Sequence, residues 1–245
     1  MNILIIGDSC TDVFVYGVCN RLCPEGPVPV FNPIKQIENK GMAGNVLQNL
    51  KSLGVENVDI ITNNEDVIKT RYVEEKSNHL ILRVDTNDCV SNSFDINQID
   101  FKKYDAVIVS DYNKGFLTKD DLVKISESHE LTFIDTKKII GEWTQKYTFI
   151  KINEIEWTNC EKNGLTYDYW KDKLIVTKSN KGCLYNNIMY PAEKNLDVRD
   201  ISGAGDTFLA GLVFSYVLTK DIEKSLQFAN KCAGFVIQKR GVSTL

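Results

Sequence analysis

The sequence predicts an α/β protein in which a mainly parallel central sheet is flanked by helices and accompanied by a small β lid. From Tyr104 onward, short apolar segments alternate with helical patterns, which is typical of a parallel sheet. Each apolar segment ends in polar or ionisable residues, and open α/β sheets bind their ligands at that edge. In the first half, β-rich segments interrupt this alternation. We therefore expect one domain over residues 1–245, with lid segments at about 13–37 and 66–86 inserted in it.

The N-terminal strand leads directly to two candidate ligand residues. The apolar run Asn2–Ile6 predicts a buried strand, and Asp8 and Asp12 follow it. Their position suits ligand binding, although a pair of turn aspartates would give the same pattern. Further along, Gly41 precedes a helical spacing of apolar residues that places Asn45 in the first helical turn. Asn45 would face the same site, or it is an ordinary helix-start asparagine.

The predicted lid consists of β-rich segments that do not fit the strand–helix alternation. The first two are Phe14–Val18 and Val28–Ile37, and prolines in the second restrict it to an edge or irregular strand. Two further segments, Ile68–Val73 and His79–Val84, predict a hairpin around a polar turn. We expect these segments to form a small β layer over the main sheet rather than a second domain with its own core.

The second half of the chain supplies the regular part of the sheet. Four strands are expected there, each followed by polar residues that face the ligand edge. The strands and the residues after them are Ala106–Val109 with Ser110 to Gly115, Leu131–Ile134 with Asp135 to Lys137, Thr148–Ile152 with Asn153 to Glu156, and Leu174–Val176 with Thr177 to Ser179. A last helical pattern runs from Ile222 to Ile237.

A Gly-rich turn at residues 200–207 carries the strongest chemical signal. Gly203 and Gly205 permit a tight turn, and an almost wholly apolar segment, Phe208–Leu218, follows as a buried helix. Free N–H groups and the helix dipole at such a helix start form an anion site. Asp206 lies there and could accept the proton of an attacking hydroxyl. An aspartate N-cap after a flexible loop is the alternative interpretation.

Composition and charge exclude several other classes of function. The 245 residues are 43% hydrophobic, and 29 basic against 33 acidic residues give a net charge of −4 without a basic stripe. We expect no nucleic-acid partner. The apolar run after Met1 is too short for a signal peptide, and no segment is long enough to span a membrane, so no membrane association is expected.

The cysteines and histidines exclude three kinds of site. The seven cysteines are odd in number and scattered, without a CxxC pair, which argues against zinc and against a disulfide framework. Reduced thiols predict a cytoplasmic protein. Neither His79 nor His129 lies in a catalytic setting, so a histidine-based triad is not expected. A Rossmann-type dehydrogenase is also excluded, because no GxGxxG follows the first strand.

The motifs together resemble those of ribokinase-type (PfkB) sugar kinases, over nearly the whole chain. The segment Asp200–Phe208 resembles the signature of that family, Asn153–Glu156 resembles its Asn-x-x-Glu element, and Thr177–Ser179 with Gly182 resembles the end of its nucleotide-side strand. The resemblance implies a ribokinase-like three-layer fold. It also implies an ATP-dependent carbohydrate kinase that uses Mg²⁺, with a potassium ion near Asp200 in some relatives.

Several segments resemble the kinase domain of bacterial D-glycero-β-D-manno-heptose 7-phosphate kinases more closely. They are Arg21–Val30, Lys69–Arg71, Leu82–Asp85, Ser110–Gly115 and Gly241–Thr244. This resemblance implies phosphorylation of that sugar phosphate to the 1,7-bisphosphate. Another sugar kinase of the ribokinase or fructokinase type, or a catalytically silent sugar- or nucleotide-binding homologue, is the alternative. The resemblance places Met42 where the family usually has a second glycine, and Thr136 where the subfamily has proline.

The resemblance assigns a role to each candidate residue. It implies that Asp206 is the general base, with an anion hole formed by Gly203, Ala204 and Gly205. The expected substrate-binding residues are Asp8, Asp12, Gly41, Asn45, Arg71, Arg83, Asp111 and Lys114. The expected ATP-binding residues are Asn153, Thr177, Ser179, Gly182 and Asn230, and Glu156 is expected near the metal. Strand-end capping for Thr177 and Ser179, and an internal contact for Asn230, are the alternatives.

Two further expectations concern the lid. Basic residues of the lid, Arg21, Lys69, Arg71 and Arg83, together with Lys114 at a strand end, would suit the phosphate of a sugar phosphate, although some could face solvent or ATP instead. Its apolar strands, Val13–Tyr16 and Val28–Phe31, would leave an exposed sheet face that seeks a partner. We therefore expect a homodimer formed through the lid.

Overall fold

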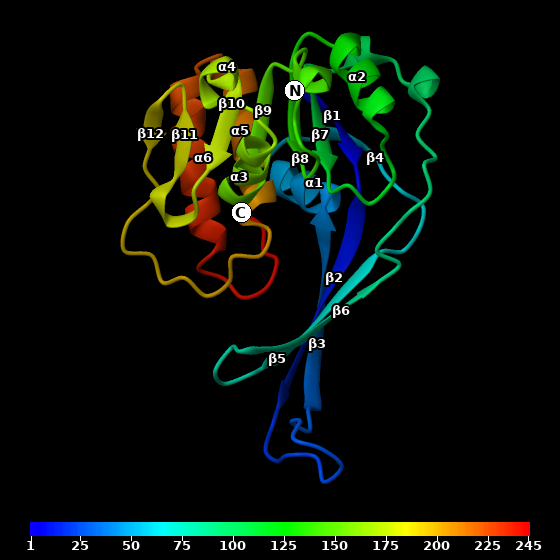
Figure 1. Ribbon diagram of the computed structural model, residues 1–245, viewed down its shortest axis with the longest axis vertical. Helices are drawn as coiled ribbons and strands as arrows, with labels where there is room; N and C mark the ends of the chain where they lie inside the picture. Colours follow the sequence, from blue (N-terminus) through cyan, green and yellow to red (C-terminus); the bar gives the residue numbers. More distant parts are fainter.

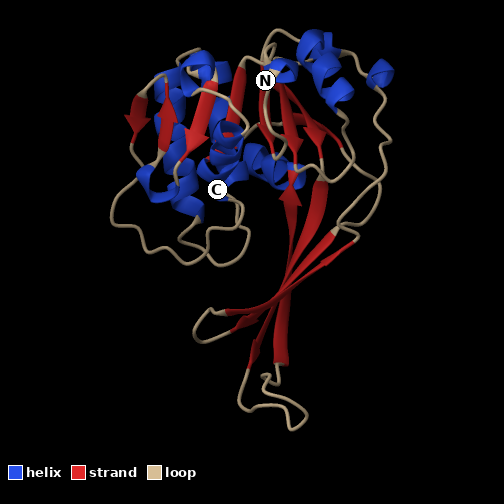
Figure 2. Ribbon diagram, viewed as in Figure 1, coloured by secondary structure: helices blue, strands red, loops and turns tan.

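The computed structural model describes all residues from 1 to 245, and they form two sheets and six α-helices (Figures 1 and 2). The main sheet has eight strands in the order β12-β11-β10-β9-β8-β7-β1-β4. Its strands are β1 (Asn2–Gly7), β4 (Asn57–Ile61), β7 (Ala106–Asp111), β8 (Thr132–Thr136), β9 (Phe149–Asn153), β10 (Leu174–Thr177), β11 (Cys183–Tyr185) and β12 (Ile188–Tyr190). All neighbouring strands from β4 to β10 in this order are parallel. The two remaining pairs, β10–β11 and β11–β12, are antiparallel.

Helices cover both faces of the main sheet and give three layers. They are α1 (Ala43–Ser52), α2 (Lys119–Ser128), α3 (Glu154–Lys162), α4 (Tyr167–Trp170), α5 (Ala204–Thr219) and α6 (Ile222–Val236). Helices α1, α5 and α6 share one apolar cluster with the sheet, while α2, α3 and α4 share another with the opposite face. Alternate residues of each strand point to opposite clusters: Ile3 and Ile5 to the first, Leu4 and Ile6 to the second. The predicted α/β fold is confirmed.

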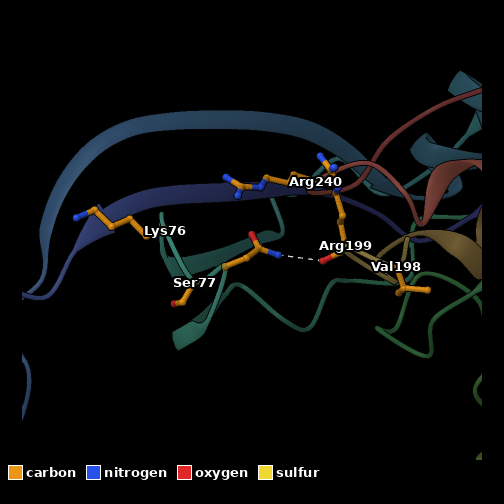
Figure 3. Close-up of a pocket in the computed structure, with 6 residues that line it drawn as sticks. Lys76, Ser77, Val198, Arg199 and Arg240 are labelled. Atoms are coloured by element: carbon orange, nitrogen blue, oxygen red, sulfur yellow. Dashed lines mark hydrogen bonds between the residues drawn. The ribbon is translucent and has the colours of Figure 1, made fainter. Parts of the chain in front are cut away.

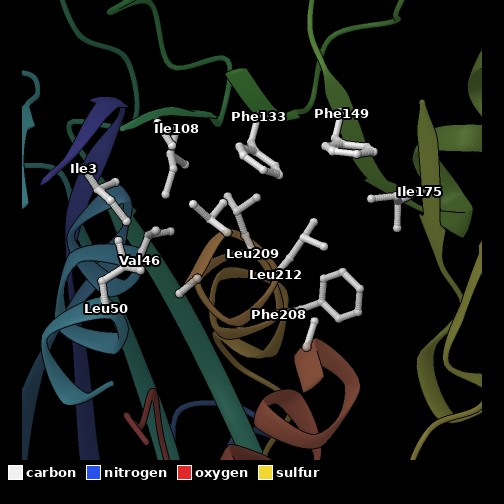
Figure 4. Close-up of a cluster of buried hydrophobic side chains, with 14 of the residues drawn as sticks. Ile3, Val46, Leu50, Ile108, Phe133, Phe149, Ile175, Phe208, Leu209 and Leu212 are labelled. Carbon is white, nitrogen blue, oxygen red and sulfur yellow. The ribbon is translucent and has the colours of Figure 1, made fainter. Parts of the chain in front are cut away.

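Helix α5 lies at the centre of the first cluster, and this explains its composition. Phe208, Leu209 and Leu212 project from α5 toward sheet residues that include Ile108 and Phe133 (Figure 4). Helices α1 and α6 pack on its other sides, so a polar face would have no contact with water. The prediction of a buried helix after the Gly-rich turn is confirmed. Because the helix is fixed on several sides, its first turn is a rigid support for chemical groups.

The lid is a separate four-stranded sheet that extends from the main body (Figure 1). Its order is β3-β2-β5-β6, with β2 (Ser9–Val18), β3 (Asn32–Met42), β5 (Ile68–Glu74) and β6 (Leu80–Thr86). Phe14, Tyr16 and Val73 of the lid form a small apolar cluster with Val242 from the C-terminal segment. The lid therefore has no large core of its own and is tied to the main body.

Two lid strands differ from their predictions. Strand β2 begins at Ser9 rather than at Phe14, so Asp12 lies within this strand. Strand β3 begins at Asn32 rather than at Val28, and residues 19–31 form a loop held by an isolated bridge between Leu22 and Pro29. Pro27 and Pro29 cannot donate to a strand ladder, so regular pairing cannot begin before them. The strand instead continues to Met42, directly before helix α1. None of the helices is long and apolar enough to cross a membrane, and all seven cysteines are free thiols.

Candidate active site

Helix α5 begins at Ala204, inside the predicted Gly-rich turn, so residues 204–207 form the first helical turn and residues 200–203 lead into it. Gly203 is the N-cap and has φ 80°, a left-handed conformation that favours glycine. A Cβ at Gly203 would lie 2.6 Å from Asn45 Nδ2, and a Cβ at Gly205 would lie 3.0 Å from Lys151 Nζ. The turn therefore brings its backbone close to α1 and to a lysine of β9. Of the three N–H groups expected to form the anion hole, that of Ala204 donates to Ile201 O at 3.3 Å and is not free. The N–H groups of Gly203 and Gly205 donate to no backbone oxygen, and together with the α5 dipole they favour a bound anion.

Asp206 lies in the first turn of α5 and is 3% exposed. Its Oδ2 accepts a hydrogen bond from Asn45 Nδ2 at 3.1 Å, and its Oδ1 accepts one from the Tyr112 hydroxyl at 2.7 Å. Burial raises the pKa of Asp206 to about 6, and these two hydrogen bonds oppose the rise. The group is thus an anion at neutral pH with a proton affinity well above that of an ordinary aspartate, which suits a general base.

Two lysines, the buried Lys151 and the partly exposed Lys137, balance the acidic groups around this turn. Lys151 of β9 pairs with Asp135 of β8 at 2.6 Å, and both side chains are almost fully buried. Lys137 bonds Glu156 and lies 3.9 Å from Asp135 Oδ1. Burial alone would raise the pKa of Asp135, but the two lysines outweigh it and hold that pKa below its ordinary value. The strand ends thus provide two cations beside the anion site.

Asp8 follows β1 at the same sheet edge and has one oxygen without a partner. Its Oδ2 accepts from the backbone N–H groups of Tyr112 at 2.7 Å and Lys114 at 3.3 Å. Its Oδ1 is buried and makes no hydrogen bond. Burial raises the pKa of Asp8, although the two N–H groups oppose this. A buried oxygen that lacks a donor suits a ligand hydroxyl.

Gly41 and Met42 join the lid to α1 at this edge. A side chain at Gly41 would collide with Asp12 and Cys10, so the glycine permits a close approach of two lid strands. Met42 adopts φ 56° and ψ −130°, a backbone conformation that glycine adopts easily but that strains a residue with a side chain. Its side chain is buried in a cluster that Tyr112 also contacts. Met42 thus keeps the backbone path of a glycine at the position where the family usually has one.

The structure gives most of the expected lid cations a carboxylate partner. Arg71 bonds Asp12 across β2 and β5, Arg83 bonds Asp85 with two contacts of 2.7 Å, and Lys114 bonds Asp88 at 2.5 Å. Lys69 is different, because it is 7% exposed and makes no ion pair or hydrogen bond. Its ammonium lies 5.7 Å from the centre of the Tyr112 ring, and burial lowers its pKa. Arg21 lies in the loop at the lid tip and is exposed.

The remaining substrate candidate, Asp111, is committed to internal contacts. Its oxygens accept from Thr136 Oγ1 and Lys138 Nζ, each at 2.5 Å, and from the backbone of Asn113. Asp111 thereby ties the loop after β7 to the loop after β8. We assign Asp111 to holding the loop that carries Tyr112 and Lys114. Asn45, another substrate candidate, donates to Asp206.

The expected nucleotide-side residues lie at the ends of β9 and β10 and on α6. Asn153 is the N-cap of α3 and forms a capping box with Glu156. Thr177 Oγ1 donates to Ile152 O at 3.4 Å, which is the strand-end contact of the alternative interpretation. Ser179 and Gly182 have φ 50° and 96°, so the loop after β10 is tightly turned. Asn230 donates to Tyr190 O at 2.9 Å, an internal contact that anchors the end of β12.

A surface cavity of about 410 Å³ lies between the β5–β6 turn and the segment before the Gly-rich turn (Figure 3). Its lining residues are Lys76, Ser77, Asn78, Val198, Arg199 and Arg240. Asn78 Nδ2 donates to Arg199 O at 2.9 Å, and Arg240 donates to Glu75 O at 3.3 Å. The lid hairpin therefore contacts the main body at its tip as well as at its base.

Sequence reasoning missed three residues of the site: Tyr112, Asp135 and Lys151. Tyr112 looked like part of a loop motif, and Asp135 like one more strand-end residue. Lys151 did leave a signal, because it interrupts the apolar run of a buried strand and a buried lysine needs an acidic partner. No group of three or more His, Cys, Asp or Glu side chains could hold a metal ion.

Comparisons with known proteins identify the family and support the fold. The model of the "pfkB family carbohydrate kinase" matches residues 42–245. The bifunctional protein HldE of a Nitratiruptor species is 31% identical over 99% of this chain, which spans 62% of that relative's length. The solved structure of the ribokinase of Thermotoga maritima is similar, with a TM-score of 0.72 at 14% sequence identity. The alignment covers 99% of this chain and 94% of the ribokinase chain.

A second solved structure has a similar score. Phosphofructokinase-2 of Escherichia coli, solved in complex with potassium, has a TM-score of 0.71 at 12% sequence identity. The alignment covers 98% of this chain and 94% of the phosphofructokinase-2 chain. At such identities these two structures show the fold, whereas the family match rests on the sequence. The chain belongs to the pfkB family of carbohydrate kinases, whose members are ATP-dependent sugar kinases.

Proposed function

We propose that the protein transfers the γ-phosphoryl group of ATP to a hydroxyl of a sugar phosphate, with Asp206 as general base. One observation carries the proposal: the buried Asp206 carboxylate stands in the first turn of α5, where Asn45 and Tyr112 hold both of its oxygens. The acceptor hydroxyl gives its proton to Asp206, and its oxygen bonds to the γ-phosphorus. The bond from that phosphorus to the β–γ bridging oxygen breaks, and ADP leaves.

The charges around the turn suit this transfer. Positioning and charge neutralisation dominate phosphoryl transfer, because the protein forms no covalent bond itself. The α5 N-terminus and the nearby lysines, Lys137 and Lys151, provide positive potential where the transferred group would lie. The Asp135 partner of Lys151 keeps the free protein from holding an uncompensated buried cation.

The residues also fit a magnesium ion bound mainly through nucleotide oxygens. Glu156, whose Oε1 accepts from Lys137, and Asp135 Oδ1, which accepts no hydrogen bond, would supply hard oxygen ligands, directly or through water. When bound, Mg²⁺ would neutralise charge on the phosphates. Asn153, Thr177, Ser179, Gly182 and Asn230 are proposed to shape the ATP side.

A potassium ion near Asp200 is a separate proposal. Both oxygens of Asp200 accept backbone hydrogen bonds, from Ser202 at 2.8 Å and Gly241 at 3.1 Å, so the carboxylate braces the Gly-rich turn. A cation there would act on the anion site through this brace. Turnover in K⁺ compared with Na⁺ at equal ionic strength tests it, and equal rates would contradict it.

For the substrate we propose D-glycero-β-D-manno-heptose 7-phosphate, converted to the 1,7-bisphosphate. Asp8 Oδ1 and Asp12 would accept hydroxyls of the sugar, and Lys69 would meet the phosphate, because it is buried and, unlike Arg71, Arg83 and Lys114, has no carboxylate partner. A phosphate would compensate the buried ammonium. Arg71, Arg83 and Lys114 would contribute by exchanging their present partners. Met42 supports the alternative of another sugar kinase, since its side chain fills space beside Tyr112 that a glycine would leave open.

We also propose a homodimer through the outer face of the lid. The strands expected to form this face do not expose it: Val13 to Tyr16 are buried within the chain, and Val28 to Phe31 lie in the loop before β3. Leu82 and Val84 of β6 share an apolar face instead and are 54% and 40% exposed. Tyr72 and Phe31 pack edge to face on it, with ring centres 5.5 Å apart. An exposed apolar sheet face of this kind usually finds a partner.

Coupled ADP-release assays test the proposed function. The candidate substrates are heptose 7-phosphate, unphosphorylated heptose and ribose, each with Mg·ATP. The proposal predicts the highest kcat/KM for the phosphorylated sugar. Equal use of free sugars would contradict the phosphate site, and binding of sugar or ATP without turnover would indicate a silent homologue.

A further inference from the structure

We propose that Tyr112 is a positioning residue for the catalytic base: its hydroxyl holds the Asp206 carboxylate in one orientation, ready for the acceptor hydroxyl. This inference rests on the proposed function, because it requires Asp206 to take the acceptor proton. The observation that carries it is the hydrogen bond of 2.7 Å from the Tyr112 hydroxyl to Asp206 Oδ1. Neither the Gly-rich turn nor the Asn-x-x-Glu element contains Tyr112.

The Asp206 carboxylate is held at both oxygens, and the two donors come from different elements. Tyr112 follows β7, and Asn45 on α1 donates to the other oxygen at 3.1 Å. Asn45 is itself fixed, because Asn49 donates to its side-chain oxygen at 3.0 Å. A carboxylate bound at both ends cannot rotate about its Cβ–Cγ bond. Each oxygen keeps a second acceptor site, so a substrate hydroxyl can still bind.

Tyr112 is anchored along its whole length. Its backbone N–H donates to Asp8 Oδ2 at 2.7 Å, so the residue links the proposed sugar site to the base. The ammonium groups of Lys69 and Lys137 lie 5.7 and 5.0 Å from the centre of its ring. Cations at this distance attract the electron-rich face of a phenol ring. A ring held in this way places its hydroxyl in a defined position.

The charges nearby keep the Tyr112 hydroxyl a donor. Burial and the carboxylates of Asp206 and Asp135 raise the pKa of Tyr112 well above its ordinary value. The phenol therefore keeps its proton at every working pH and donates it in the hydrogen bond to Asp206. A donor to the ionised carboxylate stabilises the anion, and among the causes that oppose burial at Asp206 the Tyr112 hydrogen bond is the largest.

Other charged and titratable groups face Asp206 from the surrounding elements and also affect its pKa. A test of Tyr112 must leave these side chains in place. They are Asp135 on β8, Lys137 after β8, Lys151 on β9 and Cys10 on β2. Tyr112→Phe keeps all four of these side chains and the aromatic ring. The acid limb of the pH–rate profile then reports the contact between Tyr112 and Asp206.

The first test is the Tyr112→Phe variant, assayed across pH with the sugar phosphate that gives turnover. Loss of a hydrogen bond to a charged group should move the half-maximal pH of kcat/KM upward by about one unit. The rate should fall more at pH 6 than at pH 8. The matched control is Tyr147→Phe, which removes another buried tyrosine hydroxyl, one bonded to Leu122 O at 2.8 Å. The acid limb of the control should not move.

A second variant keeps the test decisive if the phenylalanine protein folds poorly. Incorporation of 3-fluorotyrosine at position 112 preserves the ring and makes the hydroxyl a stronger donor. The acid limb should then move to lower pH, opposite to the phenylalanine variant. A limb that stays in place in the fluorotyrosine protein overturns the proposal, and so does one that moves the same way in both proteins.

The Asp206→Asn variant separates this inference from the proposed function. Lost turnover in Asp206→Asn with an unmoved limb in the Tyr112 proteins would mean that Asp206 is the base and that Tyr112 does not position it. Retained turnover in Asp206→Asn would overturn both assignments. A ¹³C NMR titration of the Asp206 carboxyl carbon, without substrate, should show the same opposite shifts. Its signal is assigned by its loss in Asp206→Asn.

Discussion

Asn45 Nδ2 and Asp206 Oδ2 are 3.1 Å apart, although 161 positions separate the two residues in the chain. The contact joins the first turn of α1 to the first turn of α5 at the proposed base. Asn45 Nδ2 also lies 3.3 Å from Gly203 O. One side chain thus fixes both the turn that would bind phosphate and the group that would accept the proton.

Replacing Asp206 with asparagine should remove most of the turnover while the fold persists. Asparagine has the same shape but cannot accept a proton at neutral pH, and one general base typically contributes about 100- to 10,000-fold in rate. The measurements are kcat together with the Kd of ATP and of the sugar. The matched control is Asp197→Asn, an exposed aspartate whose ion pair is with Arg199, and it should keep wild-type kcat. Wild-type kcat in Asp206→Asn would refute the assignment.

The pH dependence of the wild-type enzyme should show an acid limb near pH 6. Burial raises the pKa of Asp206 to about 6, and the protonated acid cannot accept a proton, so kcat/KM should fall about tenfold per unit below that pH.

Stability should follow a different course with pH. Because the folded pKa lies above the unfolded value, this group favours folding more at low pH, and that stability is lost as pH rises from about 4 to 6. Activity loss on acidification should therefore precede unfolding, as parallel circular dichroism would show. Loss of ellipticity at the same pH as the loss of activity would contradict this interpretation.

Lys69→Met should weaken binding of the phosphorylated sugar and stabilise the folded protein. Hydrogen bonds to charged groups are worth about 1.5–3 kcal/mol, so KM for that sugar should rise about 10- to 150-fold, with KM for ATP unchanged. Without ligand the buried ammonium has no partner, so its removal should raise Tm. The exposed Lys102→Met is the control for both measurements. An unchanged KM for the phosphorylated sugar would exclude Lys69 from the phosphate site.

At position 42, glycine should give a more stable protein than alanine, which reverses the usual order of stability of the two substitutions. Both Met42→Ala and Met42→Gly lose the buried side chain, which costs about 2–5 kcal/mol for alanine. Only glycine also releases the strain of φ 56° and ψ −130°, worth about 1–3 kcal/mol. Met42→Gly should therefore unfold at a higher urea concentration than Met42→Ala. The opposite order would show that the backbone at Met42 is not strained.

A charge on the outer lid face should dissociate the proposed dimer. The chain has a mass of 27.8 kDa, and sedimentation velocity should give about twice that mass if two lids pair, by the usual preference for two-fold association. Leu82→Lys should shift the protein to the monomer. The control is Leu218→Lys, an exposed leucine near the end of α5 and outside the lid. A concentration-independent monomer in the wild type would contradict the dimer.

The sequence by itself determined the layered fold and the position of the proposed base. Strand–helix alternation predicts a parallel sheet because only crossover connections join parallel neighbours. The apolar α5 segment after Gly203 and Gly205 predicts a buried helix whose exposed N-terminus attracts anions. These are local properties, encoded in residues that are close together along the chain.

Only the tertiary structure decided which charged groups are paired. Arg71 and Lys69 are two positions apart on β5, yet Arg71 meets Asp12 and Lys69 meets no carboxylate. Their partners depend on the register of β2, β5 and β6. The same holds for Tyr112, which reaches Asp206 because the carboxyl end of β7 and the first turn of α5 meet at one edge of the sheet. Hydrogen bonds and ion pairs act over a few ångströms, and packing alone sets which distant residues come that close.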